Sequence, residues 1–104
     1  MPVSHNSIIR RVLLLAVAAT MVACQIAPVQ EMSDARQALA AAKDAGAEQY
    51  AADIMQQAVD RLQSAERLLS EHKYTQARQD ALDAKSAAIE ALQRTASGKE
   101  NETR

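Results

Sequence analysis

Alanine alternates with larger apolar residues in a seven-residue repeat through the middle of this 104-residue chain. The repeat consists of Met55, Ala58, Leu62, Ala65 and Leu69, with Val59 and Leu68 beside it. Spacings of three and four residues place these side chains on one face of an α-helix, and the alanines let two helix backbones approach closely. The pattern therefore predicts a helix over about residues 48–71 that packs against other helices.

Two further segments show the same spacing and are predicted to be helices. The first covers about residues 33–45, where Ser33 or Asp34 can cap the helix start and Gly46 can end it. Its apolar positions are Met32, Ala35, Leu39 and Ala42. The second covers about residues 76–96, and Thr75 can cap it. Its apolar positions are Ala77, Ala81, Ala84, Ala88 and Ala91, with Leu82, Ile89 and Leu92 beside them.

Short connections between the three segments favour antiparallel neighbours. The predicted fold is all-α, an antiparallel up-down-up three-helix bundle over residues 32–96 with alanine-rich, coiled-coil-like seams. A single long coiled coil is the competing architecture, but Gly46 and the segment His72–Tyr74 both interrupt it. Residues 97–104 contain Gly98 and no bulky apolar residue, so they are predicted to be a disordered tail. Because alanine buries little apolar area, the bundle is expected to be marginally stable without a partner.

The N-terminal segment differs in character from the rest of the chain. Arg10 and Arg11 precede the apolar run Val12–Ala23, which is shorter than the roughly 20 residues of a membrane-spanning helix and leads into Cys24, the only cysteine. This pattern resembles the bacterial lipoprotein signal. The resemblance implies that residues 1–23 are a cleaved signal peptide and that Cys24 is lipidated and becomes the first residue of the mature protein. The alternative is a buried or spare thiol.

The residues that follow Cys24 bear on how and where the protein is attached. Residues 24–31 contain Pro28 and no periodic pattern, so they are predicted to form a flexible tether. In enteric-type lipoproteins, which this chain resembles, Asp directly after the lipidated cysteine retains the protein at the inner membrane. Gln25 stands at that position here, which implies residence in the outer membrane, facing the periplasm.

A second resemblance covers most of the sequence after Cys24. It is carried by a Gly-Ala-x-x-Tyr-Ala turn that begins at Gly46, by the alanine ladders, and by Tyr74-Thr75-Gln76-Ala77-Arg78. These features resemble small bacterial lipoproteins with an alanine-rich helical domain, the DUF4398 domain family. In that family the turn is usually followed by Pro, whereas Ala52 stands here. The resemblance implies an envelope lipoprotein with a helical periplasmic domain, and related domains are sometimes followed by a peptidoglycan-binding domain of the OmpA type.

The sequence after Cys24 offers little catalytic or ligand-binding chemistry. Its one histidine, His72, lies near a predicted helix end, where an imidazole can interact with the last carbonyls, and a zinc site of His and Cys cannot be assembled. Two aspartate pairs can each share a helix face, Asp53 with Asp60 and Asp80 with Asp83. Interleaved Arg and Lys favour solvated faces over acid–base pairs. We therefore expect no enzyme activity, no metal and no cofactor.

The aromatic content and the charge restrict the partners. Tyr50 and Tyr74 are the only Phe, Trp or Tyr residues, and each lies at a junction between a loop and a predicted helix, where a ring can cap the core at opposite ends of the bundle. The sequence after Cys24 carries all 13 acidic residues but only 10 of the 12 basic ones. A mixed, weakly acidic surface without Trp or Phe argues against nucleic acid as a partner.

Two classes of function are compatible with these observations. The favoured one is a lipid-tethered structural or protein-interaction module that binds an envelope protein or the cell wall, with an OmpA-type protein as one candidate. A homo-oligomer, resembling abundant envelope lipoproteins that assemble as helical trimers, is an alternative. A carrier of small molecules or lipids is less favoured, because it needs a cavity lined by bulky apolar residues and the seams here are mostly alanine.

Overall fold

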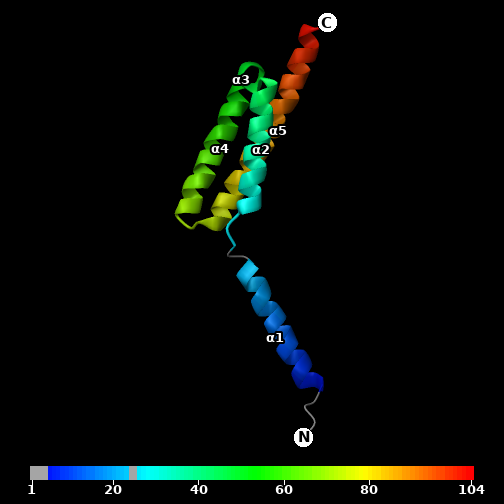
Figure 1. Cartoon of the computed structure of the whole chain (residues 1–104), viewed down its shortest axis with the longest axis vertical. Coiled ribbons are helices and arrows are strands. Elements are labelled where there is room, and N and C mark those ends of the chain that lie inside the picture. Colours follow the sequence, from blue (N-terminus) through cyan, green and yellow to red (C-terminus); the bar gives the residue numbers. More distant parts are fainter. Residues whose placement is uncertain (1–4, 24–25) are drawn as a thin grey trace.

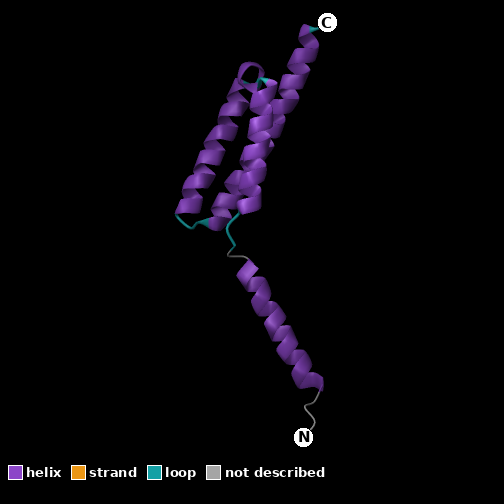
Figure 2. Ribbon diagram, in the orientation of Figure 1, coloured by secondary structure: helices purple, strands orange, loops and turns teal. Residues whose placement is uncertain are grey.

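The computed structural model describes residues 5–23 and 26–104, and every regular element within them is a helix. The helices are α1 (His5–Ala23), α2 (Val29–Ala45), α3 (Ala47–Tyr50), α4 (Ala52–Ser70) and α5 (Tyr74–Glu102). Short turns join the last four, and the described residues contain no strand (Figure 2). The predicted all-α class is confirmed.

Helices α2, α4 and α5 lie side by side, and α5 packs against both of the others (Figure 1). α2 and α5 run in the same direction and α4 runs in the opposite one, with the single turn α3 at the crossing from α2 to α4 (Figure 1). We call the end with α3 the distal end. The opposite end, where α2 starts and the turn 71–73 joins α4 to α5, is the basal end. The last turns of α5 project beyond the distal end (Figure 1).

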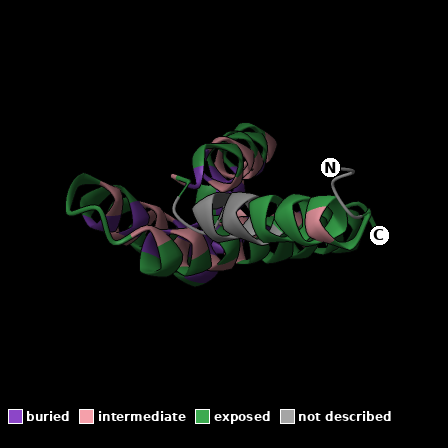
Figure 3. Ribbon diagram, turned by 90° about the horizontal axis from the view of Figure 1, so that it is seen from below, coloured by how far each residue is buried: buried purple, intermediate pink, exposed green. Residues whose placement is uncertain are grey.

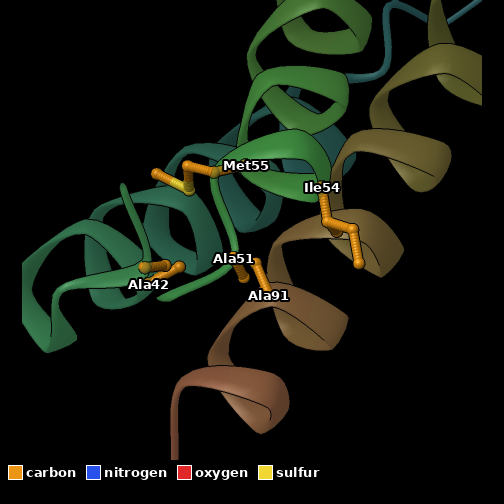
Figure 4. Close-up of a cluster of buried hydrophobic side chains, with 6 residues drawn as sticks. Ala42, Ala51, Ile54, Met55 and Ala91 are labelled. Carbon is orange, nitrogen blue, oxygen red and sulfur yellow. The ribbon is translucent and has the colours of Figure 1, made fainter. Parts of the chain in front are cut away.

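The core consists of two small clusters of buried side chains. The basal cluster contains Met32, Ala35, Ala65, Ala81 and Ala84, with Leu62 packed against it. The distal cluster contains Ala42, Ala47, Ala51, Ile54, Met55 and Ala91 (Figure 4). Most members are alanines whose side chains are wholly inaccessible, so the helices are in close contact along their seams. Each of the few large side chains therefore buries more apolar area than a single alanine does.

Helix α2 begins at Val29, four residues before the predicted start, and Gly46 ends it in the left-handed conformation with φ 94°. Pro28 directly precedes the helix and is fully buried, and its carbonyl accepts the N–H of Met32 at 3.0 Å. The prediction of a flexible tether over residues 24–31 is thus wrong for its last three residues, which are helical. Residues 29–31 are too few to show a helical repeat in the sequence. The start of α2 is instead set by the buried proline that precedes it.

The predicted single helix over 48–71 is divided in the structure. Ala51, with φ −145°, separates the single turn α3 from α4, and α4 begins at Ala52. Ala52 is the position at which the resembling family usually has Pro. Proline is favoured at the first residue of a helix, since the N–H that it lacks has no partner there and its φ is preset. A helix that starts anew at residue 52 therefore explains both the break at Ala51 and the proline that the family usually has at this position.

At the basal end the chain turns through residues 71–73. His72 has φ 61°, and its backbone N–H donates to the carbonyl of Leu69 at 3.1 Å, so the backbone rather than the imidazole makes the bond to the end of α4. α5 then begins at Tyr74 without a side-chain cap. The predicted cap at Thr75 is wrong, because Thr75 already lies inside the helix.

Helix α5 continues to Glu102, so the predicted disordered tail over 97–104 is wrong for most of its length. Thr95 extends the buried alanine seam with 1% exposure, and its hydroxyl donates to the carbonyl of Ala91 at 2.7 Å. Tertiary contacts made by Gly98, Lys99 and Glu102, described below, hold the last turns. The polar composition of residues 97–104 favours disorder when it is considered alone. It does not show that Tyr50 of α3 packs against this segment.

Helix α1 lies apart from this assembly. Among the described residues it makes no contact with another helix, and its large apolar side chains between residues 8 and 15, such as Leu14 and Leu15 at 71%, are exposed. Figure 3 shows α1 as exposed over most of its described length, whereas α2, α4 and α5 all carry buried residues. Within the described part of the chain, no helix combines the length and the apolar character needed to cross a membrane.

Candidate functional site

The predicted lipidation site, Cys24, and its neighbour Gln25 lie outside the described residues. The structure does describe the chain from Ile26 onward, and here an arginine holds it. The guanidinium of Arg78, at the start of α5, donates through Nη2 to the carbonyl oxygen of Ile26 at 3.1 Å. Its Nε donates to Oε1 of Glu31 in α2, also at 3.1 Å. The chain is therefore attached to the bundle two residues after Cys24.

This arginine clamp joins three parts of the chain. The Arg78 and Glu31 side chains are 32% and 29% exposed, so solvent screens the pair less than a fully exposed one. Charge-assisted hydrogen bonds are shorter and stronger than neutral ones, and one of these has a backbone acceptor. In the sequence, Arg78 ends the motif Tyr74–Arg78 and is one of the basic residues interleaved with the aspartates, which predicts a solvated helix face. Its pairing with residues far away in the sequence has no local signal.

The basal end also carries exposed aliphatic side chains. Ile26 and Val29 are 60% and 69% exposed. The carboxylates of this end are neutralised, since Glu31 pairs with Arg78 and Asp34 pairs with Lys85 at 3.8 Å. This end therefore combines apolar groups with paired charges.

The turn 71–73 and the residue after it contribute further charged and aromatic groups to the basal end. Glu71 is bound by Lys73 at 3.2 Å and by Arg67 at 3.4 Å. The hydrogen bond from Lys73 lowers the pKa of the Glu71 carboxyl below its usual value. The rings of His72 and Tyr74 lie 5.8 Å apart between centroids. Tyr74 is half-buried, as expected for a ring that caps the core.

Tyr50 forms the corresponding contact at the distal end. Its hydroxyl donates to Oε2 of Glu102 at 2.5 Å, and its ring lies against Gly98, where an added Cβ would be only 2.8 Å from Cδ1 of the ring. The ammonium of Lys99 lies 5.8 Å from the ring centroid and donates to the carbonyl of Ala45, the last residue of α2. The hydrogen bond to Glu102 raises the pKa of the Tyr50 hydroxyl.

This contact connects the Gly-Ala-x-x-Tyr turn that begins at Gly46 with Gly98 near the end of α5. Gly46 ends α2 and α3 carries Tyr50 toward α5, where only a glycine leaves room for the ring. The sequence prediction that Tyr50 caps the core agrees with this position. Gly98 was missed because its partner is distant in sequence.

The aspartates singled out in the sequence have separate partners. Asp80, whose side chain is 15% exposed, accepts a hydrogen bond from the Ser64 hydroxyl at 2.5 Å and pairs with Arg61 at 3.4 Å, so it joins α5 to α4. Asp60 and Asp83 accept hydrogen bonds from glutamines one turn earlier on their own helices. Asp53 is exposed in the first turn of α4. Asp80 therefore has a structural role, and the pairs do not act as units.

An open hollow of about 420 Å³ lies between α4 and α5. Its lining is mostly polar and includes Asp60, Arg61, Asp83 and Glu90. Among residues 5–23 and 26–104, no group of three or more His, Cys, Asp or Glu side chains is placed to hold a metal ion.

Two of the large apolar residues that the sequence places beside the alanine seam of α5 are exposed. Leu82 and Ile89 are 43% and 40% exposed, and they are seven positions apart, which places them on one face two turns apart. The seam positions of α5 are occupied by alanine and Thr95, so these larger side chains lie outside it. We refer to Leu82 and Ile89 as the α5 stripe.

Comparison with known families gives one match over the bundle. Residues 30–104 match the family model described as "Domain of unknown function (DUF4398)". The match begins just after the start of α2 and includes all of α3, α4 and α5. No curated protein and no solved structure matches the chain.

Proposed function

The chain belongs to the DUF4398 family, whose domain has no known function. We propose a role for it from the way its N-terminal end is attached and from the apolar side chains that α5 exposes. In this proposal it is a lipid-anchored lipoprotein of the cell envelope. Its helical bundle acts as a non-catalytic structural or protein-interaction module. Residues 1–23 are the signal peptide, and Cys24 carries the lipid.

The separation of α1 from the bundle supports this processing. Among the described residues α1 contacts no other helix, and the family match starts only at residue 30. Cleavage before Cys24 would therefore remove no contact from the bundle that follows. The arginine clamp holds the chain from Ile26 onward, close to the proposed site of lipid attachment. More than one acyl chain is needed for durable anchoring, and bacterial lipoproteins have them.

The α5 stripe supports the second half of the proposal. Leu82 and Ile89 expose apolar surface on a helix whose buried face is already packed against α2 and α4. Exposed apolar side chains grouped on one face are typical of protein–protein contacts. With outer-membrane residence proposed from Gln25, the partner would be another envelope protein or the cell wall, and an OmpA-type protein remains one candidate.

The anchoring is tested by a Cys24→Ala variant of the full chain expressed in a bacterial host. We expect the wild-type protein in the outer-membrane fraction with acylated Cys24 and without residues 1–23, and the variant unprocessed or soluble. Intact-mass spectrometry and density fractionation measure both, with Gln93→Ala as an exposed control. An unmodified cysteine on membrane-bound wild-type protein would refute the anchor.

The interaction is tested by crosslinking in intact envelopes with the double variant Leu82→Glu and Ile89→Glu. The same charges placed at Ser97 and Gln93, which are also exposed on α5, provide the control. We expect the stripe variant alone to lose the crosslinked product. A product made of two copies of this chain favours the self-associating alternative, and an unchanged product in the stripe variant contradicts the role of the stripe.

A further inference from the structure

Only a short segment, from Cys24 to Ile26, separates the proposed lipid from the folded bundle, and it limits the distance between them. Cys24 precedes Ile26 by two positions, so their Cα atoms are at most about 8 Å apart. From Ile26 onward the chain is fixed by the bonds of Arg78, by the buried Pro28 and by the start of α2. The headgroup layer on each side of a bilayer is about 5–7 Å thick. A lipid on Cys24 would therefore bring Ile26 to the membrane interface.

The chemistry of the basal end is suited to that position. Ile26 and Val29 expose aliphatic side chains, and Tyr74 presents a half-buried ring beside the turn. Aliphatic groups bury themselves at a lipid interface, and tyrosine is enriched there because one end is apolar and the other polar. An unpaired carboxylate would oppose this placement, but Glu31, Asp34 and Glu71 are each ion-paired.

We infer that the basal end of the bundle rests on the lipid surface, with Ile26 and Val29 at the bilayer interface and α5 directed away from it. The inference rests on the proposed lipidation of Cys24. Its partner is the lipid bilayer, whereas the α5 stripe remains available to a protein. At 1.5 Å per residue, the 29 residues of α5 extend to about 44 Å from the basal end.

Fluorescent labels at the two ends of the processed, acylated protein test this orientation. Thr75→Cys places a label near the basal turn and Asn101→Cys places one near the end of α5, and both positions are exposed. Acylation occupies the thiol of Cys24, so it leaves one free thiol in each variant. The vesicles contain phosphatidylethanolamine, phosphatidylglycerol and lipids with a nitroxide on the headgroup, which quenches nearby fluorophores.

We expect strong quenching at position 75 and none at position 101. Similar quenching at both positions, or none at either, on vesicle-bound acylated protein would overturn the orientation while leaving the lipid anchor in place. An unmodified Cys24 by intact mass would instead overturn the proposed function and this inference with it. The two failures are therefore distinguishable.

A second pair of variants tests the contact itself. Ile26→Ser with Val29→Ser removes the exposed aliphatic groups of the basal end, and we expect it to lower the quenching at position 75 while acylation persists. Leu82→Ser with Ile89→Ser removes exposed aliphatic groups that lie on α5, away from the basal end, and should leave the quenching unchanged. Undiminished quenching in the first pair, or equal losses in both, would overturn the contact through Ile26 and Val29.

Discussion

The two ends of the bundle hold α5 by different physical means. At the basal end Arg78 uses charge-assisted hydrogen bonds to Glu31 and to a backbone carbonyl. At the distal end the ring of Tyr50 packs on Gly98, and its hydroxyl binds Glu102. The first contact depends on a charge, whereas the second depends on the absence of a side chain. The same long helix is thus fixed by electrostatics at one end and by steric fit at the other.

The cores beneath the two ends also differ in how apolar volume is divided. Met32 is the one large, fully buried side chain of the basal cluster, whereas the distal cluster contains both Ile54 and Met55. Met32→Ala is expected to destabilise the protein by about 2–5 kcal/mol, because little else there can fill the cavity. Urea denaturation measures the change. Met55→Ala is the matched variant, and a larger loss there would reverse the comparison.

Adding a side chain at Gly98 tests the contact between this residue and Tyr50 at the distal end. Gly98→Val places atoms where the Tyr50 ring lies, so the ring must move away and its bond to Glu102 is lost. We expect a loss of about 1–3 kcal/mol, typical of overpacking, despite the better helix propensity of valine. Thermal unfolding measures it, with Ser97→Val at the adjacent exposed position as control. Equal stability of the two variants would show that the ring contact contributes nothing.

The basal contact is broken by Arg78→Ala. The variant leaves the Glu31 carboxylate and the Ile26 carbonyl without this donor, and we expect a loss of about 1–2 kcal/mol, since the pair is only half-buried. Arg94→Ala removes an exposed pair with Glu90 on the same helix and should cost at most about 0.5 kcal/mol. Chemical denaturation of both variants checks the difference. A cost for Arg78 no larger than that for Arg94 would argue against the clamp.

The smallest expected effect is a pH dependence at the distal end. Glu102 raises the pKa of Tyr50, so the folded protein keeps the phenolic proton at a pH where the unfolded chain loses it. The stabilising contribution is present below about pH 10 and is lost as the pH rises through the raised folded pKa. In a Tyr74→Phe background the phenolate absorbance reports Tyr50 alone. Glu102→Gln should lower its midpoint, and an unchanged midpoint would contradict the bond.

Local pattern was sufficient to predict the helical class and several turns. The alanine and leucine spacing around Leu62 depends on helix geometry alone, and Gly46 ends α2 because the left-handed conformation there favours glycine. The break at Ala51 was missed, because a single alanine carries no turn signal. Cys24 lies outside the described residues, so its lipidation stays a prediction.

Contacts between distant residues explain what local pattern missed. The order of the last turns of α5 depends on Tyr50, which is far from Gly98 in the sequence. The exposure of Leu82 and Ile89 depends on where α2 and α4 sit around α5, which periodicity within α5 cannot show. The sequence likewise predicts that Arg78 is a surface charge, because its contacts with Ile26 and Glu31 join residues that are far apart in the sequence.

The bond from Arg78 to Ile26 is made to the backbone, and every amino acid has that carbonyl oxygen. The identity of residue 26 is therefore free to change without loss of this acceptor. A substitution there alters what the protein presents to its surroundings but leaves the domain held in place. Residue 26 can thus diversify during evolution while the bond that holds the chain to α5 is kept.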